Sequence, residues 1–294
     1  MATSVDFSAA ALSERARAEA SRALAEDVGA GDLTAGLIDP GRRARARVLA
    51  REAAVICGAP WVEATVRQLE PAAAIRWLVS EGGRSTADQV VLEVEGSARA
   101  LLTAERTALN FLQLLSGVAT RTAVFVEAVR GTRAQIVDTR KTLPGLRLAQ
   151  KYAVRTGGGT NHRIGLYDAI LIKDNHIAGL GDPATAVRRS VELARAFPGN
   201  AGLPVEVEVD SLDQLRQVLS VQPEIVLLDN MTNEQLRAAV ARRNAVAPGV
   251  LLEASGGVNL TTVRGIAETG VERISVGALT HSATALDIAL DYDA

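Results

Sequence analysis

The sequence predicts an α/β protein with an N-terminal open-faced α/β sandwich domain, residues 1–117, followed by an incomplete TIM-like (β/α) barrel, residues 118–280. The first part contains several short runs that alternate apolar and polar positions around one helical stretch, a pattern typical of a sheet covered on one face. After Gly131 the runs become short and almost wholly apolar, and helices separate them. Such runs indicate parallel strands that are buried on both faces.

The N-terminal domain is expected to begin with a helix over residues 9–27, where apolar positions recur at helical spacing. Asp32 and Thr34 are expected to form a turn and cap after it. A second helix is predicted over 59–70. Strands are predicted at 43–57, 74–82, 88–96 and 97–105.

Glycines and a long apolar segment complete this domain. Gly82-Gly83 and Gly96 are predicted to form hairpin turns. From Glu105 to Gly131 the pattern predicts a helix that breaks at Ser116-Gly117, with Arg106 at its start, directly after a strand.

The barrel is predicted from six apolar runs that end in polar residues: 134–141, 168–175, 204–210, 224–230, 250–257 and 273–280. Capping residues, including Ser211 with Gln214 and Thr232 with Gln235, mark helices between them. Six strands fall short of eight, so either the barrel is incomplete or a further strand lies within 154–167. A C-terminal helix, residues 281–294, is expected to pack on the N-terminal domain.

The composition excludes several functional classes. With 48% hydrophobic and 22% charged residues and a net charge of −2, the chain gives no reason to expect a nucleic-acid or membrane partner. The single cysteine, Cys57, lies in an apolar run and is expected to be a buried, inert thiol. The first residues are acidic and lack a secretory pattern, and no continuous apolar run of spanning length is present, so the expected location is the cytoplasm.

Positive charge is concentrated between Asp138 and His176. This segment carries seven Lys or Arg against three acids, a net charge of +4 in a chain whose total is −2, and it holds all three lysines: Lys141, Lys151 and Lys173. A solvated basic face is the simple alternative. Because the cations fall at strand ends and beside glycines, a functional site is favoured.

The polar residues that end each apolar run are expected to converge at the mouth of the barrel, where the active sites of such barrels lie. Glu206, Glu208 and Asp210 recur every second residue, so they face the same side of one strand. Buried carboxylates require cations or a metal. For Glu206, pairing with Arg140 or Lys173 and metal binding are equally favoured. For Glu208 and Asp229, Mg²⁺ is favoured.

Glycines follow the last two strands. Ser255 and Gly256-Gly257 lead towards a helix expected near Asn259, and Gly277 follows the next strand. Such glycines allow backbone N–H groups to approach a phosphate, although plain turns are the alternative. Three consecutive glycines, 157–159, suggest a loop that delivers His162 and Arg163.

Two halves of a site follow from these residues. The cationic half comprises Arg140, Lys141, His162, Arg163 and Lys173. Opposite it are the acidic residues and a phosphate-binding end. This combination suits a ligand with carboxylates that meets a phosphosugar with Mg²⁺.

The chain resembles the quinolinate phosphoribosyltransferase family over almost its whole length. The resemblance rests on the motifs DTRKTLPG, GGGTNHR, DAILIKDNH, EVEVD, LLDN, EASGG and SVGALTHS. It implies an N-terminal α/β sandwich, a partial barrel, and a homodimer in which the N-terminal domain of one subunit closes the barrel mouth of the other. It also implies phosphoribosyl transfer from 5-phosphoribosyl 1-pyrophosphate (PRPP) to quinolinate with decarboxylation, a step of NAD biosynthesis.

The resemblance further implies roles for individual residues. Arg106 would reach the quinolinate of the partner subunit. The quinolinate carboxylates would be bound by Arg140, His162, Arg163 and Lys173. Lys141 would lie on the PRPP side, and Thr139 joins the substrate-binding set. Glu208 and Asp229 would hold the ribose hydroxyls and Mg²⁺. The 5′-phosphate would be bound by Ser255, Gly256, Gly257 and Gly277, with His281 nearby.

Other functions fit the same predicted fold. A Schiff-base lyase could use Lys173 or Lys141 at the barrel mouth on a sugar phosphate. A related phosphoribosyltransferase could act on another aromatic acid, and a non-catalytic protein could bind a phosphosugar. The cluster of cations favours a dicarboxylate, because a single carboxylate would leave several cations uncompensated.

Overall fold

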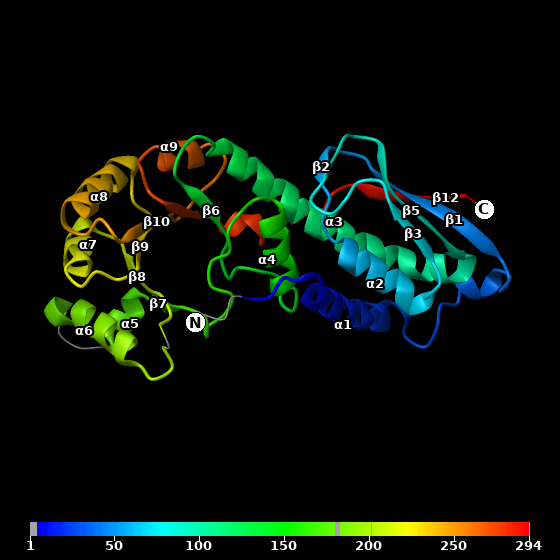
Figure 1. The fold of residues 1–294 in the computed structure, drawn as a ribbon, viewed down its shortest axis with the longest axis horizontal. Helices are drawn as coiled ribbons and strands as arrows, with labels where there is room; N and C mark the ends of the chain where they lie inside the picture. Colours follow the sequence, from blue (N-terminus) through cyan, green and yellow to red (C-terminus); the bar gives the residue numbers. More distant parts are fainter. Residues whose placement is uncertain (1–4, 180–182, 201, 294) are drawn as a thin grey trace. The chain divides into compact units, whose positions relative to one another are not determined.

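The computed structural model describes residues 5–179, 183–200 and 202–293. The chain forms two compact units. The N-terminal unit contains residues 6–123, 152–158 and the C-terminal segment from 283, and the barrel unit contains residues 124–151 and 159–282. Figure 1 labels their helices and strands.

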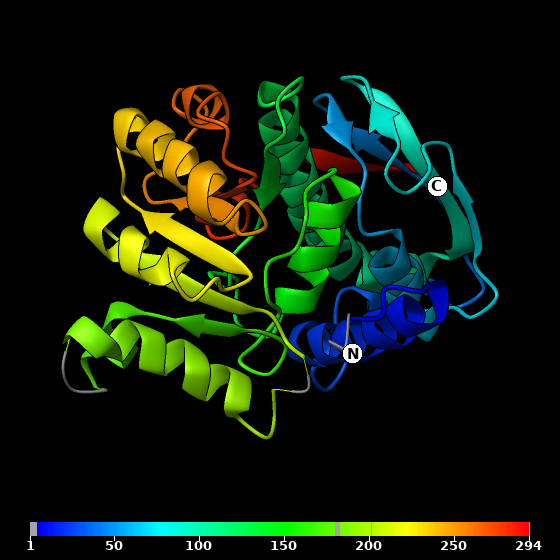
Figure 2. The ribbon, with the colours of Figure 1, turned by 60° about the vertical axis from the view of Figure 1, so that its left-hand side comes forward.

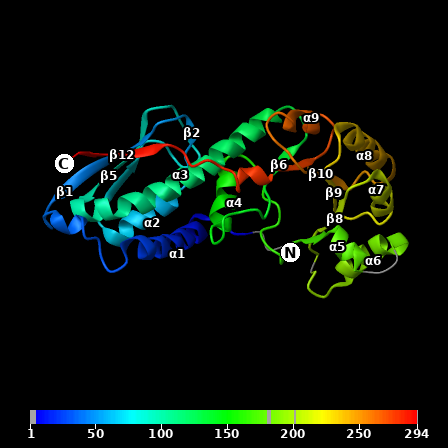
Figure 3. The same cartoon turned by 180° about the vertical axis from the view of Figure 1, so that it is seen from behind.

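The N-terminal unit is built on a four-stranded antiparallel sheet in the order β12-β1-β5-β3. Figure 3 shows β12 running along β1. The elements of this unit, in chain order, are α1 (Ala9–Val28), η1 (Ala35–Leu37), β1 (Arg43–Ala50), β2 (Ala54–Val55), α2 (Ala59–Leu69), β3 (Ala74–Trp77), β4 (Arg84–Ser85), β5 (Gln89–Ser97), α3 (Ala98–Ala128, which runs on into the barrel unit) and β12 (Ile288–Asp293).

Local sequence explains the start of this unit. The hydroxyl of Ser8 accepts a hydrogen bond from the backbone N–H of Ala11 and caps α1. As expected, Asp32 forms a turn, because its carboxylate accepts the backbone N–H groups of Thr34 and Ala35. The core joins the sheet to α2 and α3 through buried apolar residues that include Val48, Val62, Leu92, Leu109, Leu112 and Ile288.

Helix α3 corrects three expectations. Residues 98–105 form its first turns, so the strand predicted at 97–105 is wrong, and Arg106 lies within the helix. The helix continues through Ser116-Gly117 without the predicted break. Gly117 is present because a Cβ there would lie 2.2 Å from the carbonyl oxygen of Thr284. Helix α3 is long and apolar enough to cross a membrane, but 61% of its most apolar segment is buried in the protein, as in a core helix.

Two further expectations for this unit are wrong. Gly96 lies inside strand β5, where a Cβ would crowd the side chain of Glu70 at 3.1 Å, and does not form a hairpin turn. The C-terminal segment forms strand β12 instead of the predicted helix, and it pairs antiparallel with β1 from Ile288↔Ala50 to Asp293↔Arg45. Cys57 is buried, as predicted, and burial raises the pKa of its thiol.

The barrel unit contains a six-stranded parallel sheet in the order β6-β11-β10-β9-β8-β7. In Figure 2 its strands lie beside one another, with the connecting helices on one side. The elements, in chain order, are β6 (Gln135–Val137), α4 (Arg147–Thr156), β7 (Ile170–Ile172), α5 (Asp174–Ala178), α6 (Pro183–Ala196), β8 (Val205–Val209), α7 (Leu212–Leu219), β9 (Ile225–Asp229), α8 (Asn233–Val246), β10 (Leu251–Ser255), α9 (Val263–Ala267), β11 (Arg273–Ser275) and η2 (Gly277–Leu279).

Each of the six predicted apolar runs contains one of these strands, which confirms the partial (β/α) barrel. Thr160 extends the sheet by a parallel bridge to Val137, within the region where a further strand was expected. The predicted caps are present: Ser211 caps α7, and Thr232 and Gln235 form a capping box on α8. Because all six strands run the same way, their C-terminal ends meet at one rim.

Candidate active site

A cavity of about 770 Å³ opens at the C-terminal ends of the parallel strands. It brings together all of the predicted site residues except Arg106. They are Thr139, Arg140, Lys141, His162, Arg163, Lys173, Glu208, Asp229, Ser255, Gly256, Gly257, Gly277 and His281. Arg106 is exposed on α3 in the N-terminal unit. The convergence expected from the strand-end rule is therefore present, and the roles of the individual residues stay predictions.

The cationic side of the cavity includes guanidinium groups close to one another. Burial lowers the pKa of Arg163, the positive charge of Arg140 lowers it further, and the carboxylates of Glu206 and Asp168 oppose both effects. A site that gathers like charges in this way is stabilised when an anion enters it. The side-chain ammonium of Lys173 lies 2.7 Å from a carboxylate oxygen of Glu208, so one cation already has an acidic partner.

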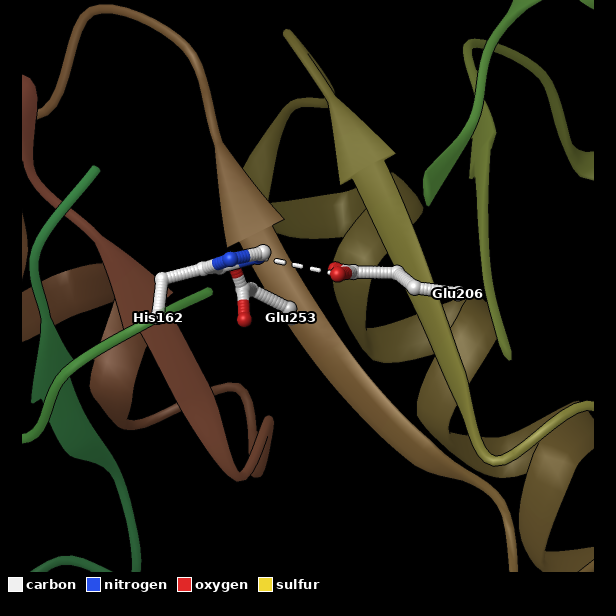
Figure 4. A group of neighbouring side chains, drawn as sticks. All are labelled: His162, Glu206 and Glu253. Atoms are coloured by element: carbon white, nitrogen blue, oxygen red, sulfur yellow. Dashed lines mark ion pairs between the residues drawn. The ribbon is translucent and has the colours of Figure 1, made fainter. Parts of the chain in front are cut away.

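His162 lies between two buried acids, as Figure 4 shows. Its Nε2 atom is 2.9 Å from Oε2 of Glu206 and 3.5 Å from Oε1 of Glu253. Burial acts to lower the pKa of His162, but the hydrogen bond to Glu206 and the charges of both carboxylates outweigh burial and raise this pKa. Burial and the charge of Glu206 raise the pKa of Glu253. The partner of Glu206 is thus His162, and neither Arg140 nor Lys173 pairs with it.

A buried ion pair supports the loop that carries His162. The ammonium of Lys151 lies 2.5 Å from a carboxylate oxygen of Asp138, and both side chains are fully buried. Lys151 also donates to the carbonyl oxygen of His162 at 3.0 Å. Asp138 accepts the backbone N–H of His162 at 2.8 Å and the amide of Asn161 at 2.7 Å. Of the three lysines in the basic segment, Lys151 is therefore a structural residue, whereas Lys141 and Lys173 line the cavity.

The acidic side comes from adjacent strands. Glu208 lies on β8, and Asp229 ends β9, where its carboxylate accepts the amide of Asn230 at 2.7 Å. Asp210, the third acid of the alternating series, is exposed and does not line the cavity. Glu208 and Asp229 supply hard oxygen donors beside an open volume. Their chemistry fits Mg²⁺, which binds one or two carboxylates together with phosphate oxygens.

Backbone conformation and close neighbours explain why glycine occupies three positions that line the cavity. Gly256 has a φ of +99°, and a Cβ there would lie 2.1 Å from the side-chain oxygen of Asn230. Gly257 also has a positive φ, of +58°. The following turn, residues 259–262, precedes α9, so this helix begins at Val263, later than expected. Beside Gly277, a Cβ would press on the side chains of Lys141 and His281 at 3.2 Å.

The phosphate-binding role that the resemblance implies for Gly256 predicts that Gly256→Ala weakens PRPP binding. The added methyl group would force the backbone and Asn230 apart at the rim of the cavity, next to Asp229. The KM for PRPP should rise by about tenfold or more, because strain of this kind costs roughly 1–3 kcal/mol. Initial rates at varied PRPP would measure this. Gly249→Ala, at a position with open space around it, is the matched control and should behave as wild type.

The sequence analysis assigned no role to two residues beneath the cavity, Glu253 and Arg273. Glu253 is the central residue of β10 and lines the cavity, and its position in the EASGG motif was the available signal. Arg273 begins β11, and its Nε donates to Oε2 of Glu253 at 2.6 Å. Arg273 is at the start of its strand, so the rule that site residues follow the C-terminal ends of the strands does not identify it. Leu171 and Leu227 add apolar surface to the cavity.

Comparison with known proteins identifies the family. The model of the quinolinate phosphoribosyl transferase N-terminal domain matches residues 32–116, and that of the C-terminal domain matches residues 118–291. The chain belongs to the quinolinate phosphoribosyltransferase family.

Individual relatives agree over nearly the full length of the chain. A Mycobacterium leprae protein named nicotinate-nucleotide pyrophosphorylase [carboxylating] is 48% identical over 282 residues, which are 95% of this chain and 97% of the relative. A probable enzyme of the same name from Bacillus subtilis is 38% identical over 90% of this chain and 89% of its own length. The solved structure of the Francisella tularensis nicotinate-nucleotide pyrophosphorylase has a TM-score of 0.88 and 41% identity, and the match covers 96% of this chain and 97% of that chain.

Proposed function

We propose that this protein is a decarboxylating quinolinate phosphoribosyltransferase, a glycosyltransferase that joins quinolinate to the phosphoribosyl group of PRPP and releases pyrophosphate and CO₂. The product is nicotinate mononucleotide, an intermediate of de novo NAD biosynthesis. One observation carries this proposal: a single cavity holds a group of cations, a pair of carboxylates and a glycine-lined rim. An aromatic diacid and a phosphorylated sugar together present the complementary charges.

The cationic side is assigned to the diacid. Arg140 and Arg163 would bind and orient the two quinolinate carboxylates, with His162 and Lys173 beside them. A ligand with two carboxylates compensates several partly desolvated cations, whereas nicotinate brings only one. Holding the ring in place also fixes its nitrogen relative to the sugar, and such positioning lowers the entropic part of the barrier.

The opposite side is assigned to PRPP. Glu208 and Asp229 would hold the ribose hydroxyls and stabilise positive charge that develops on the sugar as pyrophosphate leaves. Lys141 would neutralise the departing pyrophosphate. Ser255 and the glycines at positions 256, 257 and 277 would bind the 5′-phosphate through backbone N–H groups, with Thr139 and His281 nearby. After transfer the ring nitrogen is cationic, and its charge stabilises the electron pair left on the neighbouring ring carbon when the carboxylate departs as CO₂. That carbon then takes up a proton from water.

Mg²⁺ is proposed as the cofactor, held by Glu208 and Asp229. When bound, it supplies positive charge to the pyrophosphate oxygens. Glu208 can serve such a role although Lys173 contacts one of its oxygens, because a carboxylate has several lone pairs to share.

A homodimer is proposed as the functional assembly, and such dimers can assemble into a larger oligomer. Arg106 has an exposed side chain, and its guanidinium lies 3.8 Å from the carboxylate of the neighbouring Glu105, a weak surface pair. This leaves its guanidinium available to reach the quinolinate of the other subunit. The proposed location is the cytoplasm.

The direct test supplies the protein with quinolinate, PRPP and Mg²⁺ and follows CO₂ and nicotinate mononucleotide. We expect both products in equal amounts, little reaction with nicotinate in place of quinolinate, and loss of activity with EDTA that Mg²⁺ restores. Equal turnover of nicotinate would contradict the diacid assignment. Trapping of a substrate on a lysine by borohydride, with activity that persists in EDTA, would instead support a Schiff-base lyase.

A further inference from the structure

Both ring nitrogens of His162 make contacts in the buried layer beneath the cavity. Nε2 lies 2.9 Å from Oε2 of Glu206, and the backbone N–H of Arg163 donates to Nδ1 at 2.7 Å. Figure 4 shows Glu206 and Glu253 pointing at the imidazole from two different strands. The ring is therefore held on one edge by a carboxylate and on the other by the chain segment that carries Arg163.

This arrangement is compatible with one neutral tautomer. With the proton on Nε2, the ring donates to Glu206 and accepts from the N–H of Arg163. With the proton on Nδ1, two N–H groups would face each other on one edge, and a bare nitrogen would face two carboxylates on the other. The hydrogen bond that one ring nitrogen makes decides the state of the other. Glu206 consequently selects the form of the ring that also anchors Arg163.

The acids are costly at this depth. Glu206 is 2% exposed and Glu253 is fully buried. Among the residues that the structure describes, neither Oε1 atom has a hydrogen-bond partner, and the other oxygen of Glu253 is held by Arg273. Barrel interiors are usually filled by branched apolar side chains, and a partly satisfied polar group destabilises them. A carboxylate at this position therefore does not stabilise the fold. What it affects specifically is the imidazole of His162, which it contacts.

We propose that Glu206, supported by Glu253 and Arg273, is a positioning residue that fixes the orientation and tautomer of His162 and, through His162, the approach of Arg163 to the diacid. Glu206 does not line the cavity, so it acts through His162. The inference rests on the proposed function, in which Arg163 binds a quinolinate carboxylate and His162, whose two ring nitrogens are engaged within the protein, holds Arg163 in place.

The same three groups also have the composition of a metal site, because one ligand atom from each lies within 4.8 Å of the others. Two features favour the hydrogen-bonded network. Arg273 already neutralises part of the charge of Glu253. The separation of Nε2 and Oε2 is that of a direct N–H···O bond. Metal binding is accordingly an outcome that would overturn the proposal.

The first test uses Glu206→Leu, which removes the acceptor, and Glu206→Gln, which retains an oxygen in its place. We expect Glu206→Leu to raise the KM for quinolinate by about tenfold or more, the loss typical of a hydrogen bond to a charged group. The KM for PRPP and kcat should stay near wild type, and Glu206→Gln should restore most of the affinity. Asp210→Asn, an exposed change directly after the same strand, is the matched control. Equal changes in both KM values would indicate a purely structural role and overturn the proposal.

The second test measures the tautomer in the wild-type protein. In ¹⁵N-histidine-labelled protein the three histidines give three pairs of ring-nitrogen signals, and the pair that is lost in His162→Asn belongs to His162. We expect a protonated Nε2 and an unprotonated Nδ1. The opposite tautomer or a ring protonated at both nitrogens would overturn the proposal, and so would a stoichiometric metal ion that Glu206→Leu loses and Asp210→Asn keeps. If His162→Asn leaves the KM for quinolinate unchanged, the role of His162 in quinolinate binding fails. If that variant raises this KM but Glu206→Leu does not, only the positioning role fails.

Discussion

Lys141→Ala should reduce phosphoribosyl transfer by about 10²- to 10³-fold, the loss typical when one group that stabilises transition-state charge is removed. The side chain of Lys141 lines the cavity next to Gly277 and His281 and is exposed. Its removal leaves no buried partner without a contact, so the free energy of unfolding should change by no more than about 0.5 kcal/mol. Product formation at saturating substrates and thermal unfolding would measure the two effects.

Two variants make this test specific. Lys141→Arg retains the charge but replaces a compact ammonium by a planar fork, so we expect only partial activity. Arg216→Ala, an exposed cation on α7 whose nearest acid is 3.9 Å away, controls for the loss of one positive charge and should retain wild-type turnover. Wild-type turnover in Lys141→Ala would show that this lysine has no part in the chemistry.

Asp138→Ala should produce the largest loss of stability. Both members of the Asp138–Lys151 pair are fully buried, and burial raises the pKa of Asp138 and lowers the pKa of Lys151 against the attraction between the two charges. Removing one partner of a buried pair costs about 3–5 kcal/mol, because the remaining charge is left unsatisfied. We expect a much lower urea midpoint and, because the backbone of His162 loses its acceptor, weaker quinolinate binding in the folded fraction.

The origin of that loss can be separated from loss of packing. In the double variant Asp138→Leu with Lys151→Met, no buried charge remains, and apolar replacement of a buried pair is often close to neutral. We expect it to be more stable than Asp138→Ala, although the N–H of His162 still lacks its acceptor and the amide of Asn161 keeps only the carbonyl of residue 151. Asp213→Ala, a 91% exposed side chain, should leave the midpoint unchanged. A midpoint for Asp138→Ala equal to that of wild type would rule out a stabilising role for the pair.

The barrel and the composition of its rim could be predicted because both follow from periodicity. Buried parallel strands read as apolar runs, and the polar residues after Val137, Ile172 and Leu228 meet because such strands end at one rim. The errors arose where local sequence fits two structures. Residues 97–105 alternate, but Ala, Leu and Arg are strong helix formers, and α3 begins there. In β12 the alternation of Ile288, Leu290 and Tyr292 was a signal for a strand.

Long-range partners could not be predicted at all. The break expected at Gly117 did not occur because this glycine accommodates the carbonyl of Thr284, a neighbour far away in the sequence. The sequence left the partner of Glu206 open among Arg140, Lys173 and a metal, and only the folded chain brings His162 to it. Which of several cations pairs with a given acid depends on differences of a few ångströms between their positions, and the spacing of residues along the chain does not encode such differences.

The position of β12 affects how the chain can fold during its synthesis. This strand, Ile288–Asp293, completes the sheet of the N-terminal unit by pairing with β1, Arg43–Ala50. Translation delivers β1 before the barrel strands and β12 after them, and domains generally begin to fold as they leave the ribosome. The outer edge of β1 therefore stays unpaired on the nascent chain while the whole barrel is being made. An unpaired edge invites strand pairing between chains, so the nascent chain is most prone to associate with other chains at this edge until β12 has been made.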